Sequence, residues 1–237
     1  KKPGFDGSFI RLSDFKGASH QGPRTLQAIR DPGCGWFFRA RSEEFRKIPV
    51  NPIAYWLFAA MRAAFVGTVT RSNSIGAVVR GRRALGDEVR ISQGITTGQN
   101  ARYLRFWWEI SRENAQFDRG CERTLSERRW VAADKGGDYR RWYGNNAYVI
   151  DWLDDGDTII KSPSSTPRNL STAFQLSLAC SKISSSDVAF RYHPCGFVFT
   201  DAAVSATSER IDLDVVASFL NSSTAQALLD AVAPTMN

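Results

Sequence analysis

Long apolar runs are missing from this sequence. No stretch of its 237 residues approaches the ~18–20 consecutive apolar residues that span a bilayer, and no secretory hydrophobic region opens it. We therefore expect no membrane partner and a reducing cytoplasm as the compartment. The chain also starts abruptly at Lys1 without an initiator Met, which is typical of a segment of something longer.

Cysteine and histidine are scarce. The four Cys are scattered without a Cys-x-x-Cys pair, and there are only two His. Nothing in this spacing is typical of a disulfide scaffold in so large a chain. A zinc site would need four convergent ligands, so we expect no metal. The cysteines are Cys34, Cys121, Cys180 and Cys195.

Catalytic motifs are missing as well. The sequence has no Gly-x-Ser-x-Gly and no P-loop, which excludes the best-known hydrolytic machinery. Residues 51–55 are similar to an Asn-Pro-Pro-Tyr loop, but the second Pro is absent and the aromatic residue is displaced by one. Glu43 and Glu44 with Lys47 lack the upstream Asp of a metal nuclease. We expect no complete active site and no cofactor-binding residues within this chain.

Positive charge is abundant. The net charge is +7, and residues 1–194 hold 30 of the 31 Lys and Arg with 19 of the 24 acidic residues, which gives that part a net charge of +11. Most of the basic residues are Arg, which binds phosphate and guanine edges in a bidentate way. This distribution indicates a polyanionic partner.

Tryptophan is also frequent. Several of the seven Trp are paired with each other or lie beside Arg, as in Trp107–Trp108 and Arg141–Trp142. Trp and Arg together favour interfaces through stacking and cation–π contacts. For each Trp taken singly, a place in the core remains an open alternative.

A polar tip between two apolar segments is the strongest local pattern. Residues 88–95 alternate like a strand and residues 103–110 follow as a return strand, so we expect a hairpin with residues 96–100 as its turn. Thr, Gln and Asn at this tip can both donate and accept hydrogen bonds, which suits contact with base edges. A plain polar turn is the alternative.

A second segment, residues 135–145, begins Lys-Gly-Gly and continues into Arg-Arg-Trp-Tyr. Two glycines after a Lys allow backbone amides to approach a phosphate, and the following run offers charge and stacking planes side by side. We expect both this segment and the tip to face nucleic acid.

The remaining elements are expected as follows. Residues 17–35 are Gly- and Pro-rich and favour a connector that contains a loop, and residues 162–171 favour a loop. Residues 68–90 are Arg-rich and predict either a surface helix followed by a loop or a flexible arm. Helices are expected over residues 51–65 and 213–233, the latter capped by Asp212 or Asp214. Strands are expected over residues 147–152, 174–183, 189–192 and 196–199.

These elements predict an α+β fold in which a twisted, mostly antiparallel sheet is flanked by helices. The expected organisation is an N-terminal helical connector at residues 1–66, a target-recognition domain at residues 67–211, and a C-terminal helix at residues 212–237. Because the final helix is acidic with an apolar face, we expect it to pack on another protein part.

Several of these segments, in order along residues 45–237, resemble one family. They resemble the C-terminal half of the PglX-type methyltransferases of BREX phage-defence systems, and more broadly the TaqI-like specificity domain of type IIG restriction-modification enzymes. The block at residues 135–145 is the most specific of them. In place of the family's usual Pro-Tyr before it, this chain has Ala132-Ala133-Asp134. The segments are residues 45–49, 52–56, 94–109, 135–145, 220–222 and 234–237.

The resemblance implies that the parent enzyme transfers a methyl group from S-adenosylmethionine to the exocyclic amine of adenine, and that this part chooses the target sequence. The cofactor glycines and the Asn-Pro-Pro-Tyr loop would then lie upstream, outside this chain. The implied partners are double-stranded DNA, the upstream methyltransferase domain and other defence-system subunits. This chain alone should be inactive.

We expect the DNA-binding residues to divide by role. Six cationic side chains would bind phosphate: Arg102, Lys135, Arg140, Arg141, Arg168 and Arg191. Polar and aromatic side chains would contact bases: Thr96, Thr97, Gln99, Asn100, Trp142, Tyr143, Asn145 and Asn169. Two rivals are a protein-docking module that binds through its Trp surface and a complete small enzyme. The sequence gives neither the target DNA sequence nor the oligomeric state.

Overall fold

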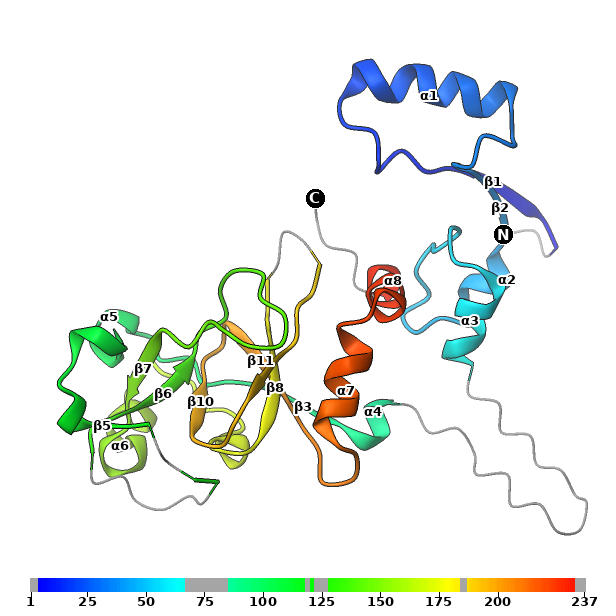
Figure 1. The fold of residues 1–237 in the computed structure, drawn as a ribbon. Coiled ribbons are helices and arrows are strands. Elements are labelled where there is room, and N and C mark those ends of the chain that lie inside the picture. The colour runs from blue at the N-terminus through cyan, green and yellow to red at the C-terminus, as the bar shows by residue number, and fades with distance from the viewer. Residues whose placement is uncertain (1–3, 67–84, 118–119, 122–127, 184–186, 233–237) are drawn as a thin grey trace, which may run out of the picture. The chain divides into compact units, whose positions relative to one another are not determined.

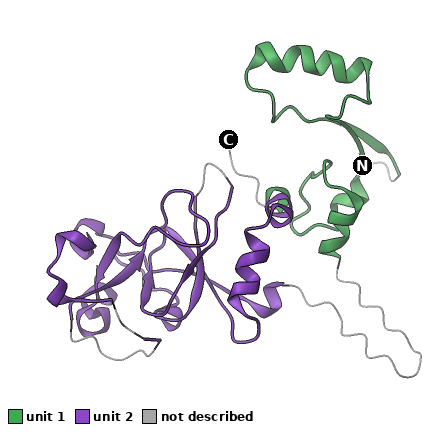
Figure 2. Cartoon of the chain, in the orientation of Figure 1, with its two compact units in different colours: residues 1–82, 230–234 green, residues 83–229, 235–237 purple. Residues whose placement is uncertain are grey.

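The computed structural model describes residues 4–66, 85–117, 120–121, 128–183 and 187–232. The chain divides into two units, coloured separately in Figure 2: residues 1–82 with 230–234, and residues 83–229 with 235–237. Most of the Arg-rich stretch at residues 68–90 lies outside the described residues, as do residues 234–237. The expected domain boundaries after residues 66 and 211 stay predictions.

Unit 1 is built on a two-stranded antiparallel sheet. Strand β1 (Asp6–Ile10) pairs with β2 (Phe37–Arg41), and helix α1 (Ala18–Arg30) lies in the connection between them (Figure 1). Most of the expected loop-containing connector is therefore helical, and its loop is residues 31–36. Gly17 precedes the helix with a φ of 82°, and Pro23 is tolerated inside it.

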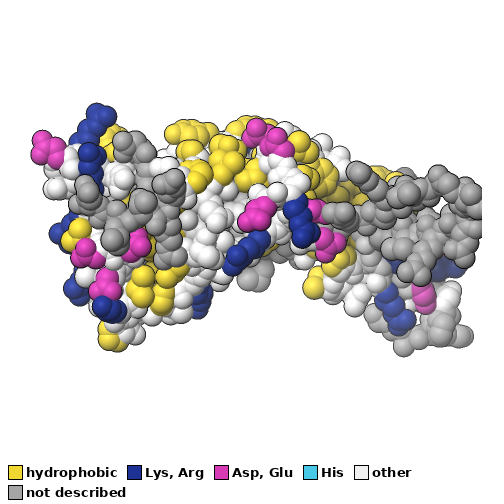
Figure 3. Space-filling model, turned by 90° about the horizontal axis from the view of Figure 1, so that it is seen from below, with side chains coloured by type: hydrophobic (Ala, Val, Ile, Leu, Met, Phe, Trp, Pro, Cys, Tyr) yellow, Lys and Arg dark blue, Asp and Glu magenta, His cyan; other side chains and the backbone are white. Residues whose placement is uncertain are grey.

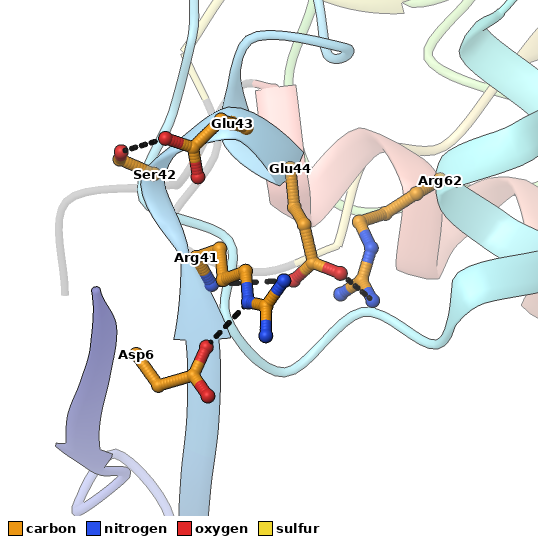
Figure 4. A network of polar contacts seen from close by, with 6 residues as sticks. All are labelled: Asp6, Arg41, Ser42, Glu43, Glu44 and Arg62. Atoms are coloured by element: carbon orange, nitrogen blue, oxygen red, sulfur yellow. Dashed lines mark hydrogen bonds and ion pairs between the residues drawn. The ribbon is translucent and has the colours of Figure 1, made fainter. Parts of the chain in front are cut away.

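Ion pairs and a helix cap hold the end of β2 (Figure 4). Arg41 Nε lies 2.7 Å from Asp6 Oδ1, across the register pair of the two strands. Helix α2 (Ser42–Phe45) follows, and Glu44 accepts a hydrogen bond from the Arg41 backbone N–H while its other oxygen lies 3.3 Å from Arg62 of α3 (Ala59–Phe65). Glu44 thus joins α2 to α3 and has a structural role.

The helix expected over residues 51–65 is shorter than predicted, because only Ala59–Phe65 are helical. Val50 and Asn51 adopt positive φ values of 60° and 52°, which a helix does not allow. The preceding segment instead contributes Ala54 and Leu57 to a small core, whose other buried members are Ile48 and Ala231.

Unit 2 contains a five-stranded and a four-stranded sheet. The first has the order β10-β6-β7-β4 with β5 also paired to β6, and the second has the order β3-β11-β8-β9. Strands β10 and β5 run parallel to β6, and all other pairs are antiparallel. The strands are β3 (Arg90–Gln93), β4 (Leu104–Phe106), β5 (Ala115–Gln116), β6 (Trp130–Asp134), β7 (Tyr148–Asp151), β8 (Ser177–Ser181), β9 (Arg191–His193), β10 (Phe197–Phe199) and β11 (Ala203–Thr207).

This arrangement confirms the predicted α+β class with mostly antiparallel pairing. It contradicts the predicted hairpin, because β3 and β4 belong to different sheets. β3 pairs with β11, so that Gln93 lies opposite Val204, whereas β4 pairs with β7 and Leu104 lies opposite Ile150. The return strand also ends early, because residues Trp107–Glu109 form a 3-10 turn named η1.

Short helices cover the sheets of unit 2. Ile159 of α6 (Asp157–Ile160) packs with Val131 and Ile150 against one face of the five-stranded sheet, and Val216 of α7 (Leu213–Leu220) packs with Leu178 against the other sheet. The remaining helices are α4 (Leu85–Glu88), α5 (Asn100–Tyr103), α8 (Ser223–Val232), and the 3-10 turns η2 (Arg112–Asn114), η3 (Leu153–Gly156) and η4 (Leu170–Thr172).

The predicted C-terminal helix is two helices. The Asp212 carboxylate accepts a hydrogen bond from the Asp214 backbone N–H, which confirms the predicted cap of α7. The helix then breaks at Asn221, whose side chain bonds to both the N–H and the carbonyl of Phe190. A disulfide joins Cys121 to Cys195, with Cα atoms 4.7 Å apart, a pairing that the scattered spacing had not indicated.

Candidate nucleic-acid interface

Three neighbouring chain segments in unit 2 run in the same direction and end together. Strands β6 and β10 are parallel, with Asp134 opposite Phe199, and Ile95 forms a parallel bridge to Thr200 next to them. The segments that follow therefore leave the same end of the five-stranded sheet. These are the turn at residues 96–100, the residues after Thr200, and the loop at residues 135–147.

The loop at residues 135–147 is anchored by Asp134, whose side chain is fully buried. Asp134 Oδ2 lies 3.1 Å from Arg191 Nη2 and 2.7 Å from His193 Nε2, and Oδ1 accepts a hydrogen bond from the Gly136 backbone N–H. The contact with His193 is a close polar contact, although neither ring nitrogen completes an aligned hydrogen bond with a described residue. One carboxylate thus fixes the start of the loop to strand β9.

These neighbours set the pKa of Asp134. Burial by itself would raise that pKa, but the contact with His193, the charge of Arg191 and the Gly136 N–H together outweigh burial and lower it below the usual Asp value. Asp134 is therefore ionised at neutral pH and balances the buried Arg191 charge.

Backbone contacts hold the rest of the loop. The Trp142 N–H donates to the Phe190 carbonyl, and the Tyr192 N–H donates to the Trp142 carbonyl, at 3.0 and 2.8 Å. Ser181 Oγ donates to the Gly137 carbonyl at 2.9 Å. Because the backbone makes these contacts, side chains of the loop are left in solvent, namely Tyr139, Arg140, Arg141, Trp142 and Tyr143.

The turn at residues 96–100 is held by the loop at residues 162–169, more than 60 positions away in sequence. Thr96 and Thr166 exchange two backbone hydrogen bonds of 3.1 and 2.8 Å. Gly98 has a φ of 69°, and a Cβ there would collide with the Ser164 carbonyl oxygen. Both a positive φ and a close backbone approach therefore require glycine at this position.

Side chains of this turn differ in how available they are. Thr97 is buried and donates to Asn100 Oδ1 at 2.6 Å, and Thr96 donates to Asp201 at 3.1 Å. Asn169 Nδ2 donates to the Gln93 carbonyl at 2.9 Å. Exposed side chains in and next to this turn and its neighbouring loop include Gln99, Asn100, Arg102 and Arg168.

The structure therefore brings most of the predicted site residues to one end of the sheet, in two groups, and corrects two of them. Arg191 is 1% exposed and paired with Asp134, so it cannot reach a phosphate. Thr97 is 2% exposed and bonded to Asn100, so it shapes the turn and does not present its hydroxyl. Asn145 is half-buried and its Nδ2 donates to the Asp138 carbonyl.

The sequence prediction missed a row of stacked rings beside the loop. Lys135 Nζ lies 4.8 Å from the ring centre of Tyr148, which stacks on Phe106 at 4.7 Å, and Phe106 stacks on Trp108 at 4.6 Å. In the sequence, only the adjacent pair Trp107 and Trp108 indicated an aromatic cluster at this position. The row joins the end of β4 to the cationic loop.

Charges of both signs are mixed on one face of the molecule. On the face seen in Figure 3, Lys and Arg lie among Asp and Glu and do not form one large basic field. The exposed cations of the candidate interface lie in and next to its loops, namely Arg102, Arg140, Arg141 and Arg168.

The described residues offer little to a metal or a thiol nucleophile. In the described ranges, no group of three or more His, Cys, Asp and Glu is arranged to hold a metal ion. Burial raises the pKa of the Cys180 thiol to about 11, so this thiol is protonated at neutral pH. Of the helices that the structure describes, none is both long and apolar enough to cross a bilayer.

Comparison with known proteins places these features in context. No family model matches the chain. It is 30% identical over its whole length to the adenine-specific methyltransferase PglX of Lacticaseibacillus casei (strain Zhang), and 26% identical over 85% of its length to the adenine-specific methyltransferase BrxX of Escherichia coli O9:H4 (strain HS). The chain spans 19% of PglX and 15% of BrxX. It is therefore similar to one segment of two much longer adenine-specific methyltransferases, which confirms the relationship suggested by its motifs.

Proposed function

We propose that this chain reads the sequence of duplex DNA for an S-adenosylmethionine-dependent, adenine-specific DNA methyltransferase that acts in phage defence or restriction-modification. The observation that carries the proposal is the end of the five-stranded sheet, where two anchored loops present exposed Arg, amide and aromatic side chains. Both relatives are adenine-specific methyltransferases. The methyl donor and the upstream methyltransferase domain would belong to the parent protein.

Positioning supports recognition by direct contact. The loop at residues 135–147 is fixed through Asp134 and through backbone pairing with β9, and the turn at residues 96–100 is fixed through Gly98. A fixed backbone presents its side chains in one register, which base reading requires.

The structure refines the division of roles. Phosphate contacts are assigned to four exposed Arg and the half-buried Lys135, and base contacts to amide side chains, with Trp142 and Tyr143 supplying stacking surfaces. Arg191 and Thr97 support the loops from beneath. Each of the other polar readers has one polar group already bonded within the chain, so each would contact a base through its remaining group; these residues are Thr96, Gln99, Asn100, Asn145 and Asn169. The phosphate set is Arg102, Lys135, Arg140, Arg141 and Arg168, and the leading base readers are Gln99 and Asn100.

A salt-titrated binding assay tests the proposal. The chain is incubated with a randomised duplex pool, bound sequences are read out, and affinity for an enriched duplex is followed by fluorescence anisotropy. Arg140→Ala should weaken binding to all sequences and reduce the slope of log affinity against log salt by about one unit. Gln99→Ala should cost about 1–3 kcal/mol at one base pair only. Arg210→Ala, an exposed Arg next to α7, is the matched control and should change neither.

Two results would contradict the proposal. Equal losses on every sequence for Arg140→Ala and Gln99→Ala would remove the division of roles. An affinity for duplex DNA that does not change with salt concentration would favour the protein-docking alternative, because phosphate contacts release counterions and therefore weaken as salt rises.

A further inference from the structure

A pocket lined by aromatic rings lies beside the candidate interface. Strand β4 ends at Phe106, and the following turn η1 is capped by Glu109, which accepts a hydrogen bond from the Phe106 N–H at 2.8 Å. This turn leaves the indoles of Trp107 and Trp108 53% and 57% exposed. The Trp107 backbone N–H donates a hydrogen bond to the Ala147 carbonyl at 2.9 Å, which connects the turn to the end of the loop at residues 135–147.

The two indoles have fixed orientations. One face of Trp108 is covered by Phe106, with ring planes 5° apart, and Phe106 is supported in turn by Tyr148. The planes of Trp107 and Trp108 are 87° apart with centres at 5.5 Å, so the two rings form a corner. A flat ligand that stacks on one indole would meet the other edge-on, which is a favoured geometry for aromatic pairs.

The pocket also contains polar groups. Its volume is about 550 Å³, which is within the range of small-molecule sites. Asn146 Oδ1 is buried without a hydrogen-bond partner among the described residues, and Arg112 also lines the pocket. A buried amide oxygen without a donor is unfavourable, and a ligand with an N–H donor would relieve it. The lining residues are Trp107, Trp108, Ile110, Arg112, Phe117 and Asn146.

We infer that this pocket binds an unstacked nucleobase. A base has a flat aromatic face for the indoles, edge groups that both donate and accept hydrogen bonds for the Asn146 amide, and an attached phosphate for Arg112. The inference rests on the proposed function, because DNA bound at the adjacent loop would supply the base. It goes beyond that function, because reading a paired duplex needs no such pocket.

Three duplexes test the pocket. The first is fully paired, the second carries one unpaired bulged adenine, and the third carries an abasic bulge that distorts the backbone equally. In anisotropy assays at fixed salt, the adenine bulge should bind at least about fivefold tighter than the abasic bulge, since stacking on an aromatic side chain is worth at least that factor. Trp108→Ala should abolish this preference and leave binding of the paired duplex unchanged.

Two further variants separate stacking from folding. Trp108→Phe keeps an aromatic face and should keep part of the preference. Phe219→Ala removes an exposed aromatic side chain on α7, 46% exposed, and should change none of the three affinities. Equal binding of the adenine and abasic bulges, or a preference that survives in Trp108→Ala, would overturn the inference.

A separate probe distinguishes failure of the pocket from failure of the proposed function. Deoxyadenosine monophosphate is added to the chain, and saturation-transfer NMR detects contact with the purine protons. A signal that disappears in Trp108→Ala supports the pocket even when no duplex is bound. Absence of this signal in the unmodified chain overturns the pocket, whatever the affinity for paired DNA.

Discussion

Asp134 connects three parts of the chain through one buried carboxylate. Arg191 and His193 come from β9, and the Gly136 N–H belongs to the loop that Asp134 precedes. A buried pair of this kind adds little net stability over an apolar pair of similar shape, but removing one partner leaves a charge without compensation. The cluster therefore matters mainly through the geometry it imposes on the loop.

Removing the cation of this buried pair should lower the free energy of unfolding. Arg191→Ala leaves the Asp134 carboxylate buried and unbalanced, so we expect the free energy of unfolding to fall by about 3–5 kcal/mol in urea titrations. The control is Lys161→Ala, because the Lys161 and Asp157 side chains are 76% and 46% exposed in their pair, which should contribute only about 0–1 kcal/mol. Equal losses in the two variants would contradict a special role for the buried pair.

The lowered pKa of Asp134 predicts a dependence of stability on pH. A carboxyl whose folded pKa lies below its unfolded value contributes stability above the unfolded pKa, and that contribution is lost as the pH falls through the folded pKa. Denaturation measured from pH 7 downwards should thus show a loss that starts near the ordinary Asp pKa of about 4. Asp134→Asn should be less stable at pH 7 and show a shallower acid limb. An unchanged slope would contradict the prediction.

At the scale of elements, local patterns predicted local features well. The strands near residues 148–151 and 197–199 and the Asp212 cap follow from alternation and capping chemistry, which depend on neighbours in sequence. The pairing of strands could not be predicted in the same way, because β3 pairs with β11, which lies more than 100 residues later in the sequence. The break in the predicted C-terminal helix was missed for a similar reason, because the Asn221 side chain bonds to the backbone of Phe190, which is distant in sequence.

For the candidate site too, local features could be predicted from the sequence and long-range contacts could not. The composition of residues 135–145 indicated an exposed cationic and aromatic loop, which the structure describes. Sequence alone could not show that Arg191 is the cation buried against Asp134, because that contact joins strands from different sheets. The row of rings from Lys135 to Trp108 was missed because its members come from three separate segments.

The contact between the turn at residues 96–100 and the loop at residues 162–169 depends on glycine. Gly98→Ala would place a side chain at a φ of 69° and against the Ser164 carbonyl, so the free energy of unfolding should fall by more than about 1 kcal/mol. Gly86→Ala is the control, since Gly86 lies in α4 with open space around it and should be neutral or stabilising. Thermal unfolding compares them, and equal effects would count against a required glycine.

At the scale of the whole molecule, each unit has its own apolar core. Ile48 and Leu57 belong to a cluster in unit 1, whereas Phe174 and Ile159 belong to a cluster in unit 2. A chain with two cores need not unfold in a single step.

Scanning calorimetry should therefore resolve two transitions. Leu57→Ala should lower one of them and Phe174→Ala the other, each by about 10 °C, because truncating a buried side chain costs about 2–5 kcal/mol. A conservative surface change such as Lys161→Arg should move neither. One transition that both core variants shift equally would show that the units unfold together.

Unit 1 is built from two separate stretches of the chain, which bears on how the residues between them could be exchanged among related proteins. Residues 230–234 return to the unit that residues 1–82 begin, so Ala231 packs in the same core as Leu57. Residues 83–229 are thus an insertion with two junctions. A different insertion could be placed between those junctions without breaking the core around it, provided that it ends in a helix whose last turn supplies an alanine-sized residue. Under the proposed function, such an exchange would alter which DNA sequence is bound while the core of unit 1 stayed the same.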